Sequence, residues 1–280
     1  MASARRIGVC SWSLQATSPQ ELAERVLAVG VDCVQLALEP LREGRWKLAE
    51  TQSVLSRAGI EVRSGMMSTF GEDYSTLATI RATGGLRPTE HWDKNVEIAR
   101  RDAELASRLG LKLVTFHAGF LPHVAHDPER ETMLGRLRAV VDIFAASNVR
   151  VAFETGQESA GTLVVVMREL DRPTAGVNFD PANMILYGMG EPVTALRLLG
   201  SRVAQVHIKD AKKAKKAGTW GSEVAVGSGE VDWNAFFAEC GRQKLKVDMM
   251  IEREAGTTRV KDMIKARELV QSHLVAGAKQ

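Results

Sequence analysis

Short runs of apolar, β-prone residues alternate along the chain with longer segments whose apolar residues recur at helical spacing. The short runs predict eight strands, at residues 6–10, 33–38, 61–67, 111–117, 150–154, 176–180, 203–208 and 247–252. The longer segments predict eight helices, at residues 19–29, 46–58, 93–109, 129–146, 162–169, 192–199, 233–241 and 258–275. Ser18 and Pro19 are typical of a helix start, and Gly30 is typical of a helix end.

This alternation predicts the α/β class, because strands that are separated by helices pair in parallel. A chain of 280 residues fits a single (β/α)8 TIM barrel, which typically needs about 250 residues. No Pro/Ser-rich linker interrupts the units, so we expect one domain over residues 1–280. An open, doubly wound sheet is the alternative, but the first units lack a Gly-x-Gly-x-x-Gly turn.

Four residues that bind metals well stand at or near the ends of four successive predicted strands: Glu154, Asp180, His207 and Glu252. Each follows an apolar run that should be buried. In a parallel barrel the carboxyl ends of the strands meet at one edge, so the four side chains should converge there. For each residue alone, an ion-paired position at a strand end is the simpler interpretation.

One imidazole and three carboxylates form an oxygen-rich ligand set that suits one divalent cation. Mn²⁺ is favoured, and Co²⁺, Mg²⁺ or Zn²⁺ would also fit. The two glutamates come from the first and last of the four strands, so they should flank a molecule bound between them. A carboxylate on each face can remove a proton from one side of a carbon and return it on the other.

Composition narrows the class of protein. A net charge of +3 gives no reason to expect a nucleic-acid partner. Three distant cysteines argue against a disulfide framework, and no apolar run is long enough for a signal peptide or a membrane span. We therefore expect a cytoplasmic protein without a membrane partner, and the sequence leaves self-association open.

Two predicted loops, at residues 68–92 and 211–232, are longer than barrel loops usually are. Both follow strands at the edge where the site is expected, so they are candidate lids or substrate walls, with simple decoration as the alternative. The second loop begins with a lysine run, at positions 212, 213, 215 and 216, which is a solvated run or an anion clamp.

Several motifs in the second half of the chain resemble a known family. They are Val-Thr-Phe-His-Ala-Gly at 114–119, Phe-Glu-Thr-Gly at 153–156, Asn-Phe-Asp-Pro-Ala-Asn at 178–183, Val-His-Ile-Lys-Asp-Ala at 206–211, Gly-Ser-Gly-Glu-Val-Asp-Trp at 227–233 and Ile-Glu-Arg at 251–253. The chain resembles the sugar phosphate isomerase/epimerase family of xylose isomerase-like TIM barrels. That superfamily also holds ketose 3-epimerases, inosose dehydratases and apurinic endonucleases.

The resemblance implies a metal-dependent isomerase or epimerase that acts on a small sugar, sugar phosphate or polyol. In the ketose 3-epimerases, two glutamates, an aspartate and a histidine bind one Mn²⁺ or Co²⁺, and the glutamates exchange the C3 proton. These correspond to Glu154, Asp180, His207 and Glu252, with Glu154 and Glu252 as the catalytic pair. Dehydration of an inosose, β-elimination from a 3-keto sugar, and a non-catalytic sugar-binding barrel stay open as alternatives.

Asn183 stands where family members often have a second histidine, and it can bind a sugar hydroxyl but is a poor ligand for a second cation. Trinuclear phosphodiester cleavage is disfavoured because only His117 accompanies His207 at the strand ends.

Four further residues are candidates for substrate contact. His117 could bind substrate or be a structural histidine, and Trp12 could stack on a sugar. Lys209 should point into the barrel mouth, where it could polarise a carbonyl or simply pair with Asp210 or Glu252. Glu158 could contact hydroxyl groups, with an exposed loop position as the alternative.

Overall fold

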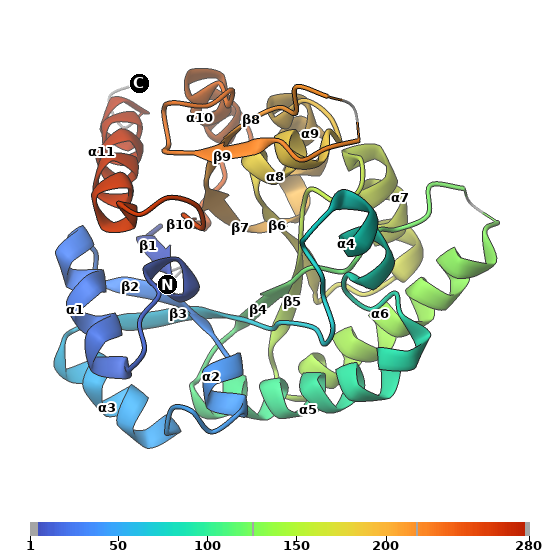
Figure 1. Ribbon diagram of the computed structural model, residues 1–280, viewed down its shortest axis with the longest axis horizontal. Helices are drawn as coiled ribbons and strands as arrows, with labels where there is room; N and C mark the ends of the chain where they lie inside the picture. Colours follow the sequence, from blue (N-terminus) through green and yellow to red (C-terminus); the bar gives the residue numbers. More distant parts are fainter. Residues whose placement is uncertain (1–4, 125, 217, 278–280) are drawn as a thin grey trace.

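The computed structural model describes residues 5–124, 126–216 and 218–277. Eight parallel strands close into a barrel in the order β1-β10-β7-β6-β5-β4-β3-β2 (Figure 1). The strands are β1 (Ile7–Cys10), β2 (Cys33–Ala37), β3 (Glu61–Met66), β4 (Leu113–Phe116), β5 (Arg150–Glu154), β6 (Ala175–Phe179), β7 (Val203–Ile208) and β10 (Asp248–Ile251). The predicted TIM barrel is confirmed, and the open sheet is excluded because β1 pairs with both β2 and β10.

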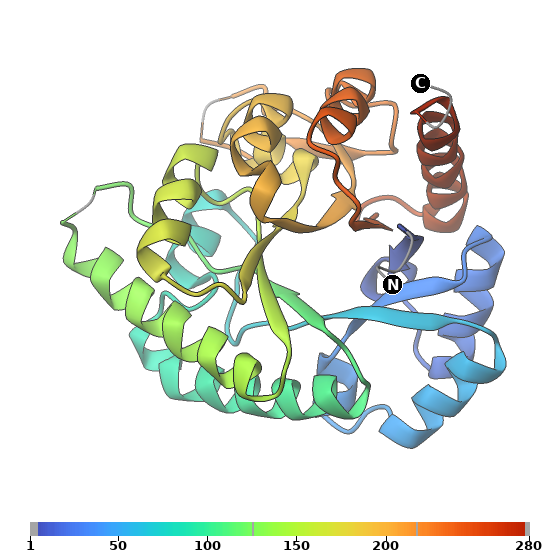
Figure 2. The same ribbon diagram turned by 180° about the vertical axis from the view of Figure 1, so that it is seen from behind.

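A ring of helices surrounds the barrel, and Figure 2 shows it from behind. These helices are α1 (Pro19–Val29), α3 (Leu48–Arg57), α5 (Trp92–Arg108), α6 (Pro128–Ala146), α7 (Ala160–Leu170), α9 (Pro192–Leu199), α10 (Trp233–Arg242) and α11 (Arg259–Gly277). Each corresponds to a predicted helix. The start and end of α1 follow the expected signals, since Ser18 Oγ accepts from Glu21 N and Gly30 has a positive φ of 82°. No helix among the described residues is long and apolar enough to cross a membrane.

No boundary of a predicted element differs from the structure by more than two residues, and β4 is one example, since it begins two residues later than the pattern predicts. Leu111 belongs to the preceding turn, because its backbone N–H donates to Ala106 O. The hydrophobic pattern could not separate this residue from the strand, since Leu111 is buried like the strand residues that follow it. Where a helix end and the next strand start lie in one apolar run, only the backbone hydrogen bonds define the boundary between them.

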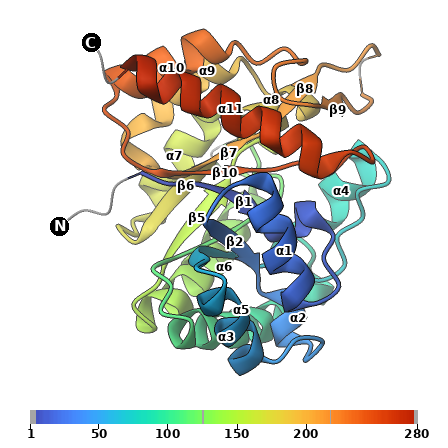
Figure 3. The same ribbon diagram turned by 90° about the vertical axis from the view of Figure 1, so that its left-hand side faces the viewer.

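The two long loops contain structure that the sequence did not predict. Residues 68–92 include α4 (Leu77–Thr83) and the 3-10 helix η2 (Thr89–His91), and residues 211–232 include β9 (Ser222–Val224). β9 pairs antiparallel with β8 (Asp210–Lys212). Figure 3 shows α4 and the β8–β9 hairpin at the same end of the barrel. The other unpredicted short elements are η1 (Ser11–Leu14), α2 (Glu39–Arg42), α8 (Pro181–Tyr187) and η3 (Gly200–Arg202).

The inside of the barrel contains a layer of hydrogen-bonded polar side chains. Gln205 Nε2 donates to Gln35 Oε1 at 2.8 Å and to Asn178 Oδ1 at 3.2 Å. Gln35 Nε2 donates to Thr115 Oγ1 at 2.7 Å, and Ser64 Oγ donates to Gln205 Oε1 at 2.6 Å. Because buried polar groups are costly unless they are paired, this layer holds its members in fixed orientations.

Candidate active site

The four predicted metal-binding side chains meet at the carboxyl edge of the barrel. Glu154 ends β5, Asp180 follows β6, His207 lies on β7 and Glu252 follows β10. One ligand atom from each lies within 4.8 Å of those from the other three. All four residues are at most 3% exposed. Four strands that are neighbours in the barrel thus place three carboxylates and one imidazole around one point.

The ring of His207 is oriented by the polar layer below it. Nε2 lies 2.7 Å from Gln35 Oε1, which can only accept, so we assign the ring proton to Nε2. Asn178 Nδ2 also lies 3.0 Å from Nε2, but as a donor it bonds to Glu154 Oε2 and not to the protonated ring nitrogen. Nδ1 faces the carboxylates, 3.3 Å from Glu154 Oε1 and 3.3 Å from Glu252 Oε2. Burial opposes ionisation of His207, but Cys10 and these two glutamates outweigh it and raise the pKa of His207 well above its usual value. Loss of the Nδ1 proton leaves the tautomer that can bind a metal through Nδ1.

Sequence reasoning did not identify Gln35 and Asn178, although both contact His207. The strand pairing is irregular at both positions, between Val34 and Gln35 in β2 and between Val177 and Asn178 in β6. For Asn178, alternation was nevertheless a usable signal, because it stands two residues before Asp180 and therefore lies on the same face of the strand. For both residues there was also a chemical signal, since each is a polar residue inside an otherwise apolar run.

Each of the two glutamates is held by its own pair of donor side chains. Asn183 Nδ2 donates to Glu154 Oε1 at 2.9 Å, and Asn178 Nδ2 donates to Oε2 at 3.3 Å. Trp12 Nε1 donates to Glu252 Oε1 at 2.8 Å, and Lys209 Nζ lies 2.9 Å from Oε2. Both carboxylates are therefore fixed in position before any ligand binds.

Asp180 has a second role at the start of α8. Its Oδ1 caps the helix by accepting from Ala182 N at 2.7 Å and Asn183 N at 3.0 Å. Pro181 at the first helical position favours this helix start. Since capping occupies only Oδ1, the other oxygen stays directed at the cluster, 4.0 Å from His207 Nδ1.

The positive charges near the cluster stabilise the ionised form of two of its three carboxylates. Burial opposes ionisation of Glu252, but Lys209 and His207 outweigh it and hold the pKa of Glu252 well below its usual value. Burial also opposes ionisation of Glu154, whose pKa is nevertheless lowered by His117 and His207. Burial raises the pKa of Asp180 well above its usual value, and the neighbouring glutamates raise it further. A third carboxylate is thus disfavoured until another cation is present.

The residues fit a bound divalent cation. Asp180 Oδ2, His207 Nδ1 and Glu252 Oε2 are buried, and none forms a hydrogen bond with the described residues, although Lys209 forms an ion pair with Glu252. Unpartnered buried polar atoms are rare in native proteins, and here they face one another. The group of Glu154, Asp180, His207 and Glu252 could therefore hold a divalent metal ion.

A pocket of about 390 Å³, which we call the inner pocket, opens beside this cluster and is lined in part by Glu252. Four predicted substrate-contact residues also line it: Trp12, His117, Asn183 and Lys209. The lining also includes residues that no sequence signal indicated: Tyr74, Tyr187, Trp220, Glu223 and Glu254. Glu158 does not line the inner pocket, so its proposed contact with substrate stays a prediction without geometric support.

Glu158 also differs from the exposed loop residue that was its alternative interpretation. It is only 3% exposed, and its carboxyl group accepts no hydrogen bond from the described residues. Burial raises the pKa of Glu158 to about 8. A buried carboxyl group without a partner favours the protonated form, because ionisation would leave an unpaired charge away from water.

Glu158→Gln should therefore make thermal stability less dependent on pH. The folded protein holds the Glu158 proton up to a pKa of about 8, while the unfolded chain releases it near 4.5. The contribution of the Glu158 proton to the free energy of unfolding of the wild type is therefore fully present below pH 4.5 and is lost as pH rises through 8. The variant should gain on the order of several degrees in Tm relative to wild type at pH 9 and little at pH 5. The exposed control Glu24→Gln should show no such difference, and equal shifts at both pH values would contradict the assignment.

Comparisons with known proteins agree with the fold. The family model for the xylose isomerase-like TIM barrel matches residues 23–272. The crystal structure of a xylose isomerase domain protein from Planctomyces limnophilus is 30% identical, with a TM-score of 0.89 over 99% of this chain and 100% of that chain. No curated protein matches this chain in sequence.

Two more distant structures share the fold. The probable 3-DHS dehydratase AsbF from Bacillus anthracis is 16% identical, with a TM-score of 0.71 over 95% of this chain and 98% of that chain. A D-allulose 3-epimerase from Methylomonas sp. is 16% identical, with a TM-score of 0.70 over 96% of this chain and 98% of that chain. Because the family model covers most of the sequence, this chain belongs to the xylose isomerase-like TIM barrel family.

Proposed function

We propose that this protein is a metal-dependent isomerase or epimerase of a sugar or sugar phosphate. The observation that carries the proposal is the pair Glu154 and Glu252, two buried carboxylates of one candidate metal group that come from the two outer strands of its four neighbouring strands. β6 and β7 separate their strands in the barrel, so the two glutamates flank the site. Each can accept or return a proton at a carbon that lies between them.

The protein's own residues supply positioning and proton transfer. Trp12 and Lys209 hold Glu252, while Asn183 and Asn178 hold Glu154, so neither base needs to reorganise before it reacts. A divalent cation, when bound to the four side chains, would polarise the substrate carbonyl and acidify the neighbouring C–H bond. The carboxylate-rich set favours Mn²⁺, and Co²⁺, Mg²⁺ or Zn²⁺ would also fit. The fold shared with a D-allulose 3-epimerase supports this assignment.

A dehydratase or β-eliminating lyase is the second candidate, and Lys209 favours it. Its ammonium group lies 2.9 Å from Glu252 Oε2 and 2.7 Å from Glu254 Oε2, at the wall of the inner pocket. An acid beside the base could protonate a departing oxygen after the same first proton abstraction. The fold is also shared with a probable dehydratase. The candidate from another class is a barrel that binds sugars without reacting with them.

Exchange with solvent separates these candidates. The protein with Mn²⁺ is incubated with a panel of ketoses, ketose phosphates and inososes in D₂O, and the products are followed by NMR. An isomerase or epimerase should place deuterium at the carbon next to the carbonyl and release no leaving group. Release of water or of a glycosidic group would identify the lyase instead. Thermal stabilisation by a sugar without any exchange would identify a binding protein.

A further inference from the structure

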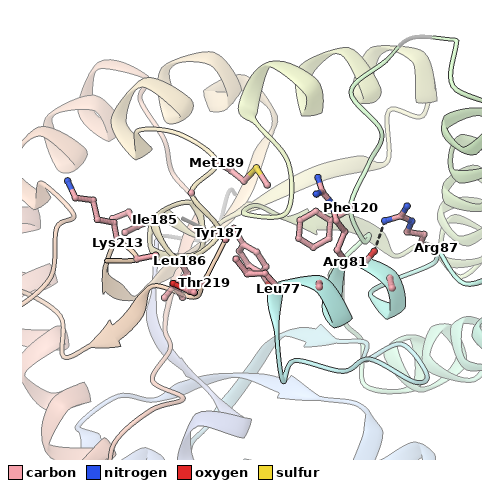
Figure 4. A pocket seen from close by; sticks show the side chains of 15 residues that line it. Leu77, Arg81, Arg87, Phe120, Ile185, Leu186, Tyr187, Met189, Lys213 and Thr219 are labelled. Atoms are coloured by element: carbon pink, nitrogen blue, oxygen red, sulfur yellow. Dashed lines mark hydrogen bonds between the residues drawn. The ribbon is translucent and has the colours of Figure 1, made fainter. Parts of the chain in front are cut away.

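A second cavity, of about 760 Å³, adjoins the inner pocket, and we call it the outer cavity. Leu186 and Tyr187, at the end of α8, line both spaces. Most of the other walls come from the two long loops, with Leu77 and Arg81 on α4 in the first and Lys213 and Thr219 in the second (Figure 4). Phe120, from the segment that follows β4, completes the apolar side. The outer cavity is thus built largely by additions to the regular barrel, and it shares Leu186 and Tyr187 with the inner pocket.

The walls of the outer cavity are largely apolar and partly aromatic. Phe120 and Tyr187 meet edge to face at 5.6 Å, and Tyr187 meets Trp220 of the inner pocket at 4.9 Å. Leu77 and Met189 pack against the same cluster (Figure 4). Aromatic and aliphatic walls of this kind favour a flat apolar group over a second sugar, whose hydroxyl groups would lack hydrogen-bond partners there.

The polar part of the lining is cationic. Arg81, Arg87 and Lys213 line the outer cavity, and no described acidic residue does. Arg87 is neutralised by Glu129 and also donates to Arg81 O at 2.6 Å. Arg81 instead lies 5.3 Å above the Phe120 ring and forms no ion pair with a described residue. Arg81 is therefore a cation that remains available to a ligand, on the side of the cavity formed by α4.

We propose that the outer cavity binds an aromatic substituent that ends in an anionic group and is attached to the sugar that reacts in the inner pocket. The sugar ring would lie against Glu252 and Lys209, the link would pass Leu186 and Tyr187, and the anion would pair with Arg81. This inference rests on the proposed function and refines it, because it makes the substrate an aryl-substituted sugar and not a free one. Charge complementarity and the shared wall support it.

The test uses 4-carboxyphenyl β-D-glucoside and its uncharged counterpart, phenyl β-D-glucoside, with the full-length protein and Mn²⁺. Calorimetry should show that wild type binds the carboxyphenyl glucoside at least about ten-fold more tightly than it binds phenyl glucoside. Arg81→Gln should abolish this difference. The exposed control Arg168→Gln, which lies on α7 away from both spaces, should preserve it.

Equal binding of the two glucosides to wild type, or an unchanged preference in Arg81→Gln, would overturn the proposal. A wild-type dimer that dissociates in Ala82→Glu would also overturn it, because it would assign the outer cavity to a second copy of the chain. Failure of the proposed reaction is distinguishable, since binding is measured without turnover. A charge-dependent preference in a protein that catalyses no exchange in D₂O would leave the outer cavity assigned and the isomerase reaction refuted.

Discussion

Replacing either Glu154 or Glu252 with glutamine should lower turnover by about 10²- to 10⁴-fold, the usual contribution of general acid–base catalysis. Glutamine keeps the shape of the side chain and one ligand oxygen, but it cannot take up a proton near neutral pH. The loss should therefore fall mainly on kcat, with a smaller effect on KM. Deuterium incorporation should fall in the same proportion, as NMR in D₂O would measure directly.

The two losses should not add in the double variant, because both glutamates serve one proton relay and one metal group. Glu24→Gln, an exposed substitution on α1, is the control for a general effect of removing a carboxylate. Wild-type turnover in both single variants would refute the two-glutamate mechanism. The next base to test would then be His117, which lines the inner pocket.

The sequence predicted the barrel because its signals are local and repeated. Each strand is an apolar run, each helix has its own period, and strand–helix alternation permits few arrangements. The same logic placed Glu154, Asp180, His207 and Glu252 together, since residues at strand ends share one edge whatever the details of packing. A set of metal-binding residues can therefore be predicted from sequence when each residue stands at the end of a strand in the strand–helix repeat.

What the sequence did not predict depends on contacts between distant segments. α4 and the β8–β9 hairpin lie outside the repeat, and neither the outer cavity nor the cationic position of Arg81 has a local signal. The lysine run illustrates this: its four lysines are exposed, as expected of a solvated run, yet Lys213 also lines the outer cavity. The burial of Glu158 is likewise a consequence of tertiary packing.

Loss of two carboxylates of the candidate metal group should strongly lower the affinity of the protein for Mn²⁺. Apo-protein titrated with Mn²⁺ should bind one equivalent, measured by the loss of the free-ion signal in electron paramagnetic resonance. Glu154→Ala/Asp180→Ala removes two of three carboxylates and should weaken binding by at least about 100-fold, because few ligands and little compensating charge remain. Equal affinity in this double variant would refute the assignment of the metal group. Circular dichroism checks that the variant is folded.

Gln35→Leu tests the orientation of His207 without removing any ligand. The leucine cannot accept the Nε2 proton, so the tautomer that leaves Nδ1 free loses its partner at 2.7 Å. Residues that orient a metal ligand typically contribute about 10- to 100-fold to affinity, and we expect Mn²⁺ binding to fall within that range. Gln271→Leu, an exposed substitution on α11, should bind Mn²⁺ as wild type does. Wild-type Mn²⁺ affinity in Gln35→Leu would show that Gln35 does not set the tautomer of His207. The assignment of Nδ1 as the metal-binding nitrogen would then lose its basis, although the four-residue metal group would still stand.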